Sequence, residues 1–220
     1  MMTKAVMTKA MLPKEVGILG GTFDPVHQGH IACADFVRRY CQLDEVRLMP
    51  CHLPAHRASP GVDGPTRAEM VKLAIQHHPA LALEPLELNK ATPSYTVDSV
   101  QLLTAREPGS RFYFIIGMDS LCYFRQWKNW QGILQHCHLL VCQRPGYQAT
   151  EGDAPYLLEH YAVDNLSALK QQPAGAILLL PNPLNDISAS QIRQQLHSSG
   201  TAAALDPAVL NYIQSRQLYR

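Results

Sequence analysis

Along most of this chain, two patterns of apolar and polar residues alternate: short runs typical of strands, and the spacing typical of amphipathic helices. Short apolar or alternating runs, typical of strands, lie at 16–19, 45–50, 81–88, 111–117, 138–142 and 176–180. Between many of them, apolar residues recur at the three-to-four spacing of amphipathic helices. Alternation of strands and helices is typical of α/β folds. The pattern predicts a doubly wound parallel sheet with helices on both faces.

The predicted helices fall between these runs. They start near Gln28, at Pro65, near Val97 and after Ser188, and a small amphipathic helix is expected within 207–220. Residues 148–174 have mixed polarity and carry no motif that predicts a role. Residues 1–14 repeat Met-Thr-Lys-Ala without an apolar face, so we expect a flexible leader followed by one domain over 15–220.

Length and charge narrow the classes of protein that this chain can be. Its 220 residues can bury a full core, and 19 basic against 18 acidic residues leave no basic excess for a broad nucleic-acid surface. No apolar run reaches the length of a membrane span, and no secretory segment is visible. We therefore expect neither nucleic acid nor membrane as a partner, and a cytoplasmic location.

The six cysteines include no Cys-x-x-Cys pair. His136, Cys137, His138 and Cys142 could suggest a metal site. Thiols near a buried strand in a reducing compartment are the favoured interpretation. We therefore predict no metal site formed by protein side chains.

The segment 17–30 carries the strongest chemical signal. A buried run leads to Gly20 and Gly21, which are expected to let the backbone turn sharply and approach a ligand, and then to a helix start. This arrangement offers N–H groups and a positive helix end to phosphate. His27 and His30 would share one face of the first helical turn. Such a pair suits charge stabilisation during phosphoryl or nucleotidyl transfer; the alternative is two surface histidines without a role.

Residues 20–30, Gly-Gly-Thr-Phe-Asp-Pro-Val-His-Gln-Gly-His, resemble the signature of the nucleotidyltransferase superfamily with an HxGH motif. The longer form resembles its bacterial nicotinate-mononucleotide adenylyltransferase branch, and the resemblance covers residues 16–220. It implies a Rossmann-like fold and transfer of the adenylyl group of ATP to nicotinate mononucleotide, with release of pyrophosphate, in NAD biosynthesis. It also implies catalytic roles for His27, His30 and Arg193, and ATP contacts from Gly20, Gly21, Thr22 and Phe23.

Two further elements of the family pattern concern ATP. A Pro-x-His-Arg element ends at Arg57, whose guanidinium could hold phosphate oxygens through parallel hydrogen bonds; a solvated loop arginine is the alternative. Gly117 and Asp119 follow a predicted strand, and parallel sheets bind ligands at this end of their strands. The Asp119 carboxylate could accept hydrogen bonds from ribose hydroxyls, cap the next helix, or do both.

A last ATP element lies at the start of the helix after residue 187. Ser188 is a natural helix cap. The resemblance implies that Ser188, Ser190 and Arg193 hold ATP phosphates. Ala189 stands where the family commonly has a serine, and Ser190 stands where it commonly has threonine.

The expected mononucleotide site combines a helix start and an aromatic ring. Ser94 is a natural cap for the helix near Val97, and a helix start offers free N–H donors to a carboxylate. The resemblance implies that the Ser-Tyr-Thr element at 94–96 receives the nicotinate carboxylate and that Trp127 stacks on the pyridine ring, a favourable cation–π pair. Trp130 is assigned to packing. The substrate-binding residues expected here are Tyr95, Thr96, Trp127 and Arg144.

The implied mechanism needs no activated side chain. The mononucleotide phosphate is already ionised, so catalysis consists of aligning two polyanions and neutralising the departing pyrophosphate. Magnesium would enter as MgATP, without dedicated protein ligands. Alternatives are transfer to another phosphate monoester, such as nicotinamide mononucleotide or phosphopantetheine, a CTP donor, or a nucleotide-binding regulator without turnover.

Overall fold

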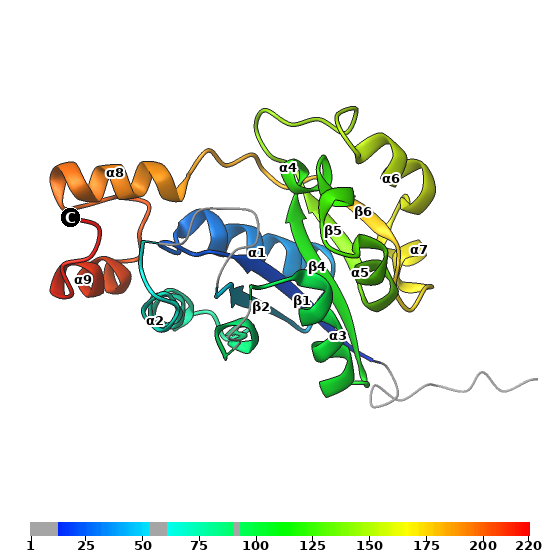
Figure 1. Cartoon of the computed structure of the whole chain (residues 1–220), viewed down its shortest axis with the longest axis horizontal. Coiled ribbons are helices and arrows are strands. Elements are labelled where there is room, and N and C mark those ends of the chain that lie inside the picture. Colours follow the sequence, from blue (N-terminus) through cyan, green and yellow to red (C-terminus); the bar gives the residue numbers. More distant parts are fainter. Residues whose placement is uncertain (1–12, 53–60, 90–92) are drawn as a thin grey trace, which may run out of the picture.

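The computed structural model describes residues 13–52, 61–89 and 93–220. Its centre is a six-stranded sheet with the order β3-β2-β1-β4-β5-β6, in which every pairing is parallel (Figure 1). The strands are β1 (Lys14–Gly21), β2 (Glu45–Pro50), β3 (Leu81–Leu83), β4 (Ser110–Gly117), β5 (His138–Cys142) and β6 (Ile177–Leu180).

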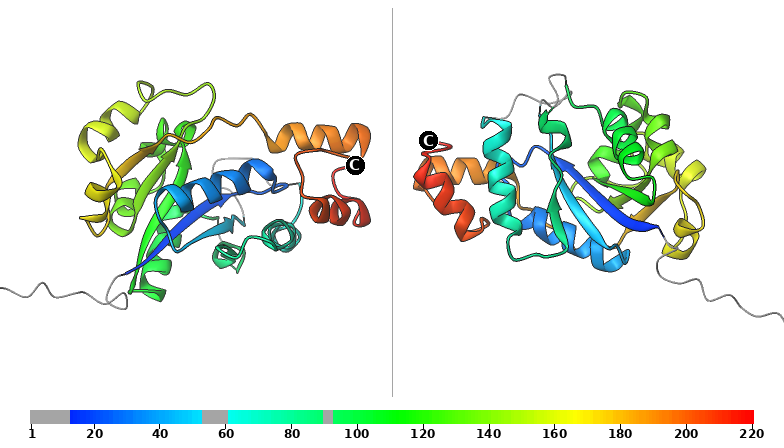
Figure 2. Two further views of the ribbon diagram at one scale, coloured as in Figure 1. Left: turned by 180° about the vertical axis from the view of Figure 1, so that it is seen from behind. Right: turned by 90° about the horizontal axis from the view of Figure 1, so that it is seen from below.

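Helices connect and flank these strands. They are α1 (Gln28–Tyr40), α2 (Gly64–Ile75), η2 (Leu86–Asn89), α3 (Thr96–Arg106), α4 (Met118–Leu121), η3 (Phe124–Gln126), α5 (Trp130–His136), α6 (Ala154–Tyr161), α7 (Leu166–Lys170), α8 (Ala189–Ser199) and α9 (Pro207–Ser215). The pair α8 and α9 lies at one end of the molecule, with α9 packed on α2 (Figures 1 and 2).

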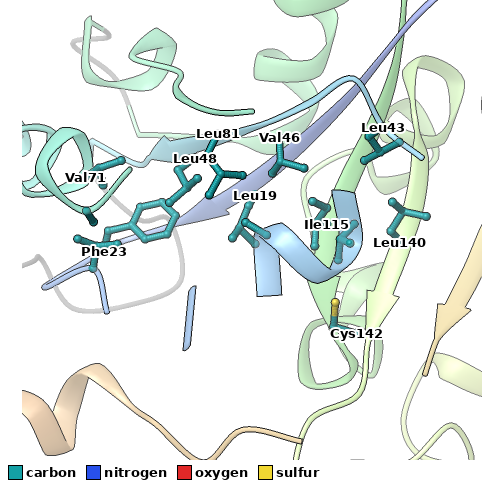
Figure 3. Packing of buried hydrophobic residues seen from close by; sticks show 14 of the residues in the cluster. Leu19, Phe23, Leu43, Val46, Leu48, Val71, Leu81, Ile115, Leu140 and Cys142 are labelled. Atoms are coloured by element: carbon teal, nitrogen blue, oxygen red, sulfur yellow. The ribbon is translucent and has the colours of Figure 1, made fainter. Parts of the chain in front are cut away.

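The core lies on both faces of the sheet because successive strand residues point to opposite sides. On one face, apolar residues of the strands meet α1, α2, α8 and α9; Leu19, Leu48, Ile115 and Leu140 belong to this cluster (Figure 3). On the other face, Val16 and Ile18 belong to a cluster with residues of α3, α5 and α6. The predicted doubly wound sheet is confirmed.

The order of the strands locates a ligand site. The chain builds β1, β2 and β3 in one direction and then crosses back to place β4 on the other side of β1. In parallel sheets, ligands bind beyond the carboxyl ends of the strands where this order reverses. Here the reversal lies between β1 and β4, whose carboxyl ends carry the residues from Gly20 to His30 and from Gly117 to Asp119.

Three details differ from the prediction. The expected strand at 81–88 is wrong beyond Leu83: Pro85 has no N–H for a ladder, Glu84 turns inward to Arg47 and Arg106, and η2 follows. The unassigned residues 148–174 contain α6 and α7, which pack beside β6. Of the expected leader, 1–12 lie outside the described residues and Lys14 already belongs to β1.

No helix in the described ranges is both long and apolar enough to cross a membrane.

Candidate functional site

The turn after β1 differs from the expected glycine turn. Gly20 and Gly21 are the last residues of β1, and the left-handed backbone occurs at Phe23, with φ 49°, next to a cis peptide between Asp24 and Pro25. The glycines relieve crowding: a Cβ on Gly20 would lie 3.0 Å from the Phe114 ring, and one on Gly21 would lie 3.2 Å from the Phe23 ring. Phe23 itself is buried in the core.

His27 and His30 lie at the start of α1 with their rings stacked, at a centroid distance of 3.7 Å. His27 is the N-cap residue, and its backbone N–H donates to Nδ1 of His30 at 3.2 Å. A neutral His30 therefore carries its proton on Nε2. His27 is 6% exposed, and its Nδ1 is buried without a partner in the described structure. Gly29 leaves room for this ring, since a Cβ there would lie 3.0 Å from Nδ1 of His27.

Burial and a neighbouring cation keep both rings neutral at pH 7. Desolvation, with a smaller contribution from Arg144, lowers the pKa of His27 to about 4. The pKa of His30 is lowered well below its usual value by burial and then by His27 and Arg144. The pair is therefore a set of neutral hydrogen-bond donors and acceptors beside an arginine.

The start of α8 contacts the turn after β1. Ser188 caps α8, its Oγ accepting from the N–H of Gln191 at 3.3 Å, as expected. Arg193 donates through Nη1 to the backbone oxygen of Asp24 at 2.7 Å and through Nη2 to Oγ of Ser190 at 3.3 Å. Asn185, just before α8, lies close to Gly29. The structure thus brings Arg193, Ser190 and the histidine segment together.

The carboxyl ends of β4 and β5 add an ion pair. Nε of Arg144 lies 3.7 Å from Oδ1 of Asp119, and this oxygen is buried without a hydrogen-bond partner in the described part of the chain. Gly117 is needed here because a Cβ would collide with the Asp119 carboxylate. The cap interpretation of Asp119 is wrong: Gly117 is the N-cap of α4, and no side chain caps this helix. An unsatisfied carboxylate oxygen at this position can accept a hydrogen bond from a ligand hydroxyl.

The expected mononucleotide residues lie at the start of α3 and just after η3. Tyr95, not Ser94, is the N-cap of α3, and Ser94 instead accepts a hydrogen bond from the backbone N–H of His52 at 3.1 Å. Lys128, the residue after Trp127, contacts the start of α3. Its Nζ lies 4.2 Å from the centroid of the Tyr95 ring and 3.4 Å from the Asp98 carboxylate. Thr96 is the first residue of the helix.

Both tryptophans are half-buried against the same apolar cluster. Trp127 packs on Phe124 at a centroid distance of 5.1 Å and meets Phe114 edge-on at 6.3 Å. Trp130 packs on Phe124 and Tyr161, at 6.3 and 6.0 Å. Burial therefore does not separate the two tryptophans, and the stacking role of Trp127 stays a prediction.

Arg67 is a positioning residue that none of the motifs described above includes. It lies in α2, is 1% exposed, and donates to the backbone oxygens of Thr22 at 2.5 Å, Cys51 at 2.7 Å and Val62 at 3.0 Å. It thereby ties the turn after β1 to the segment after β2. An arginine among the apolar positions of a helix is the sequence signal for such a role. Arg57 lies outside the described residues, so its role stays a prediction.

The described residues contain no group of three or more histidine, cysteine, aspartate or glutamate side chains that could hold a metal ion. The ring of His138 is instead engaged by the backbone of Gln172 and Ala176, at 3.1 and 3.2 Å. All six cysteines are free, and Cys33 and Cys142 approach to 3.5 Å between their sulfur atoms.

Comparison with known proteins identifies the family. The model of the family described as cytidylyltransferase-like matches residues 18–195. A Shewanella frigidimarina protein named "Probable nicotinate-nucleotide adenylyltransferase" is 40% identical over 209 residues, 93% of this chain and 99% of the relative. A Cronobacter sakazakii protein of the same name is 43% identical over 206 residues, 91% of this chain and 94% of the relative.

Solved structures agree in fold. The nicotinic acid mononucleotide adenylyltransferase of Plasmodium falciparum, solved in complex with NaAD, superposes with a TM-score of 0.69 at 21% identity, covering 94% of this chain and 97% of that chain. The same protein in complex with APC also gives 0.69, at 20% identity. The motifs, the sheet order and these relatives agree, and the chain belongs to the cytidylyltransferase-like family, among the nicotinate-nucleotide adenylyltransferases.

Proposed function

We propose that this protein transfers the adenylyl group of ATP to nicotinate mononucleotide, forming nicotinate adenine dinucleotide and pyrophosphate in NAD biosynthesis. One observation carries the proposal. At the reversal of strand order, the structure gathers a stacked histidine pair, an arginine from α8 and an Asp119–Arg144 pair. The names of the relatives that share most of the chain support the same reaction.

The reaction requires charge neutralisation more than proton transfer. The attacking phosphate of the mononucleotide is already an anion near neutral pH, so no base has to activate it. Neutral imidazoles can donate hydrogen bonds to the α-phosphate, Nε2–H of His30 being the available donor. Arg193 and Ser190 would contact the departing phosphates, with Thr22, Phe23, Gly20 and Gly21 forming the adjacent wall. Magnesium would arrive bound to ATP and be held by its phosphates.

The mononucleotide would occupy the space between α3 and Trp127. The first N–H groups of α3, beside Tyr95 and Thr96, have no side-chain cap in the described structure and can receive the carboxylate of the pyridine ring. Asp98 in the first turn would repel that carboxylate, but Lys128 offsets its charge at 3.4 Å. A neutral carboxamide would gain less from this environment, so we expect a preference for the acid.

Pyrophosphate release by purified protein tests the proposal. ATP is paired with nicotinate mononucleotide, nicotinamide mononucleotide or phosphopantetheine, and CTP replaces ATP in a parallel series. We expect release with ATP and nicotinate mononucleotide, weaker release with the amide, and little with the other pairs. Preference for another acceptor or for CTP would reassign the substrate, and nucleotide binding without release from any pair would indicate a regulator.

A further inference from the structure

Asp24, between β1 and α1, is a buried carboxylate whose two oxygens have neutral donors. The residue is 6% exposed. Its Oδ1 accepts a hydrogen bond from the hydroxyl of Tyr219 at 2.6 Å, and its Oδ2 accepts one from the backbone N–H of Gly61 at 3.0 Å. Tyr219 follows α9 and is separated from Asp24 by 195 positions in the sequence. The far end of the described chain thus contacts the turn that leads into the histidine helix.

Arg193 lies beside the same carboxylate without being hydrogen-bonded to it. Its Nη1 donates to the backbone oxygen of Asp24 at 2.7 Å, whereas the distance from Nη1 to Oδ2 is 4.0 Å. The side chain is 39% exposed. Its guanidinium therefore still presents donors outward, and these donors are what an incoming phosphate needs.

We propose that Tyr219 is a positioning residue for ATP. Its hydroxyl donates a hydrogen bond to the Asp24 carboxylate and so leaves the guanidinium of Arg193 available to the phosphates. The inference rests on the proposed function of Arg193. Without the hydroxyl, Oδ1 of Asp24 would be buried and unsatisfied. Among the described residues, the cation within reach of this carboxylate is Arg193, already 4.0 Å from the other oxygen, and arginine binds carboxylate and phosphate with the same donors.

The hydroxyl suits this task because it stays protonated. Burial, and then the hydrogen bond to Asp24, raise the pKa of Tyr219 far above its usual value. A neutral donor satisfies the carboxylate without adding a cation that would hold ATP in place of Arg193. Asp24 also lies next to the expected phosphate site, where an uncovered carboxylate would repel ATP.

Replacement of the hydroxyl tests the proposal. In Tyr219→Phe, we expect the dissociation constant of a non-hydrolysable ATP analogue, measured by calorimetry, to rise about tenfold. The KM for ATP should rise similarly, and the KM for nicotinate mononucleotide should stay within about twofold of the parent value. Tyr212→Phe is the matched control, because Tyr212 lies in α9, the helix just before Tyr219, and its hydroxyl has no hydrogen bond in the described structure. Equal affinities of the two variants would overturn the proposal.

A second background separates positioning from structural support. In Asp24→Asn protein there is no carboxylate to capture Arg193, so adding Tyr219→Phe should change analogue affinity by less than about twofold. A tyrosine that only stabilises α9 would cost the same affinity in both backgrounds, and that result would overturn the proposal. Because analogue binding needs no acceptor, it also separates this proposal from the reaction: a tenfold loss without any turnover would leave Tyr219 supported and refute the transferase.

Discussion

At the residue scale, the histidine pair combines burial with neutrality. A buried imidazolium beside Arg144 would be costly before ATP binds, and the lowered pKa values of both rings avoid that cost. Neutral rings still donate hydrogen bonds, and donors placed before the reaction need no reorganisation as charge develops. The stacked geometry thus holds donors near the expected α-phosphate without storing an unpaired charge.

Replacement of His30 by alanine should separate catalysis from stability. We expect His30→Ala to lower the turnover of purified protein by about 100-fold or more, because a donor to the developing charge is lost. Melting temperature should change little, since the ring's hydrogen bond to the His27 N–H contributes about 1 kcal/mol. His197→Ala, at an exposed position of α8, is the control. Unchanged turnover in His30→Ala would remove this ring from the mechanism.

The pH dependence of stability should report on His27. Its pKa is about 4 in the folded protein and 6.5 when unperturbed, so between these values the unfolded chain binds the extra proton. The protein should therefore keep its full free energy of unfolding above pH 6.5. As pH drops from 6.5 to 4, protonation of His27 in the unfolded chain should lower this free energy by about 3 kcal/mol. Urea titrations of the parent and His27→Gln across this window measure the difference. Parallel pH profiles of the two proteins would contradict the assignment.

At the element scale, motifs at strand ends and helix starts could be predicted because their spacing reflects local structure. The start of α1 and the Ser188 cap of α8 are such cases. Features that depend on distant partners could not: Tyr219 and Arg193 meet Asp24 across 195 and 169 positions. The shift of the α3 cap from Ser94 to Tyr95 has the same origin, because the hydroxyl of Ser94 accepts a hydrogen bond from a distant backbone N–H, that of His52.

Trp127, the half-buried residue that follows η3, should affect the KM for one substrate more than the KM for the other. If Trp127 stacks on the pyridine ring, Trp127→Ala should raise the KM for nicotinate mononucleotide by about tenfold or more and that for ATP far less. Trp130→Ala is the comparison, because it removes similar packing and should lower melting temperature without this asymmetry. Equal changes in both KM values for Trp127→Ala would show that its role is structural.

Lys128 should affect the choice between acid and amide. Its ammonium lies at the start of α3, over Tyr95 and beside Asp98. Lys128→Met should lower the ratio of kcat/KM for nicotinate over nicotinamide mononucleotide by about three- to tenfold, a modest effect because the side chain is exposed to solvent screening. Lys72→Met, an exposed change on α2, should leave the ratio unaltered. A ratio unchanged in Lys128→Met would assign selectivity to the helix N–H groups alone.

At the scale of the whole molecule, the site depends on segments that the sheet alone does not join. Strand order brings the ends of β1 and β4 together, but the turn after β1 and the segment after β2 need separate support. Arg67 provides it, a buried cation whose donors are distributed over backbone oxygens from both segments. An arginine among apolar helix positions signals a buried role, but backbone carbonyls are acceptors that no sequence pattern reveals, so the partners of Arg67 could not be predicted from the order of residues.

Arg67 should therefore be required for folding more than for any one substrate. Arg67→Met leaves several buried carbonyls without donors, and we expect the free energy of unfolding in urea to fall by about 3 kcal/mol or more. Arg67→Lys should recover little, because a single ammonium cannot reach the oxygens of Thr22, Cys51 and Val62 in the geometry of the guanidinium fork. Arg39→Met, at a largely exposed arginine of α1, controls for loss of charge. Parent-like stability of Arg67→Met would mean that the two segments hold their positions without this side chain.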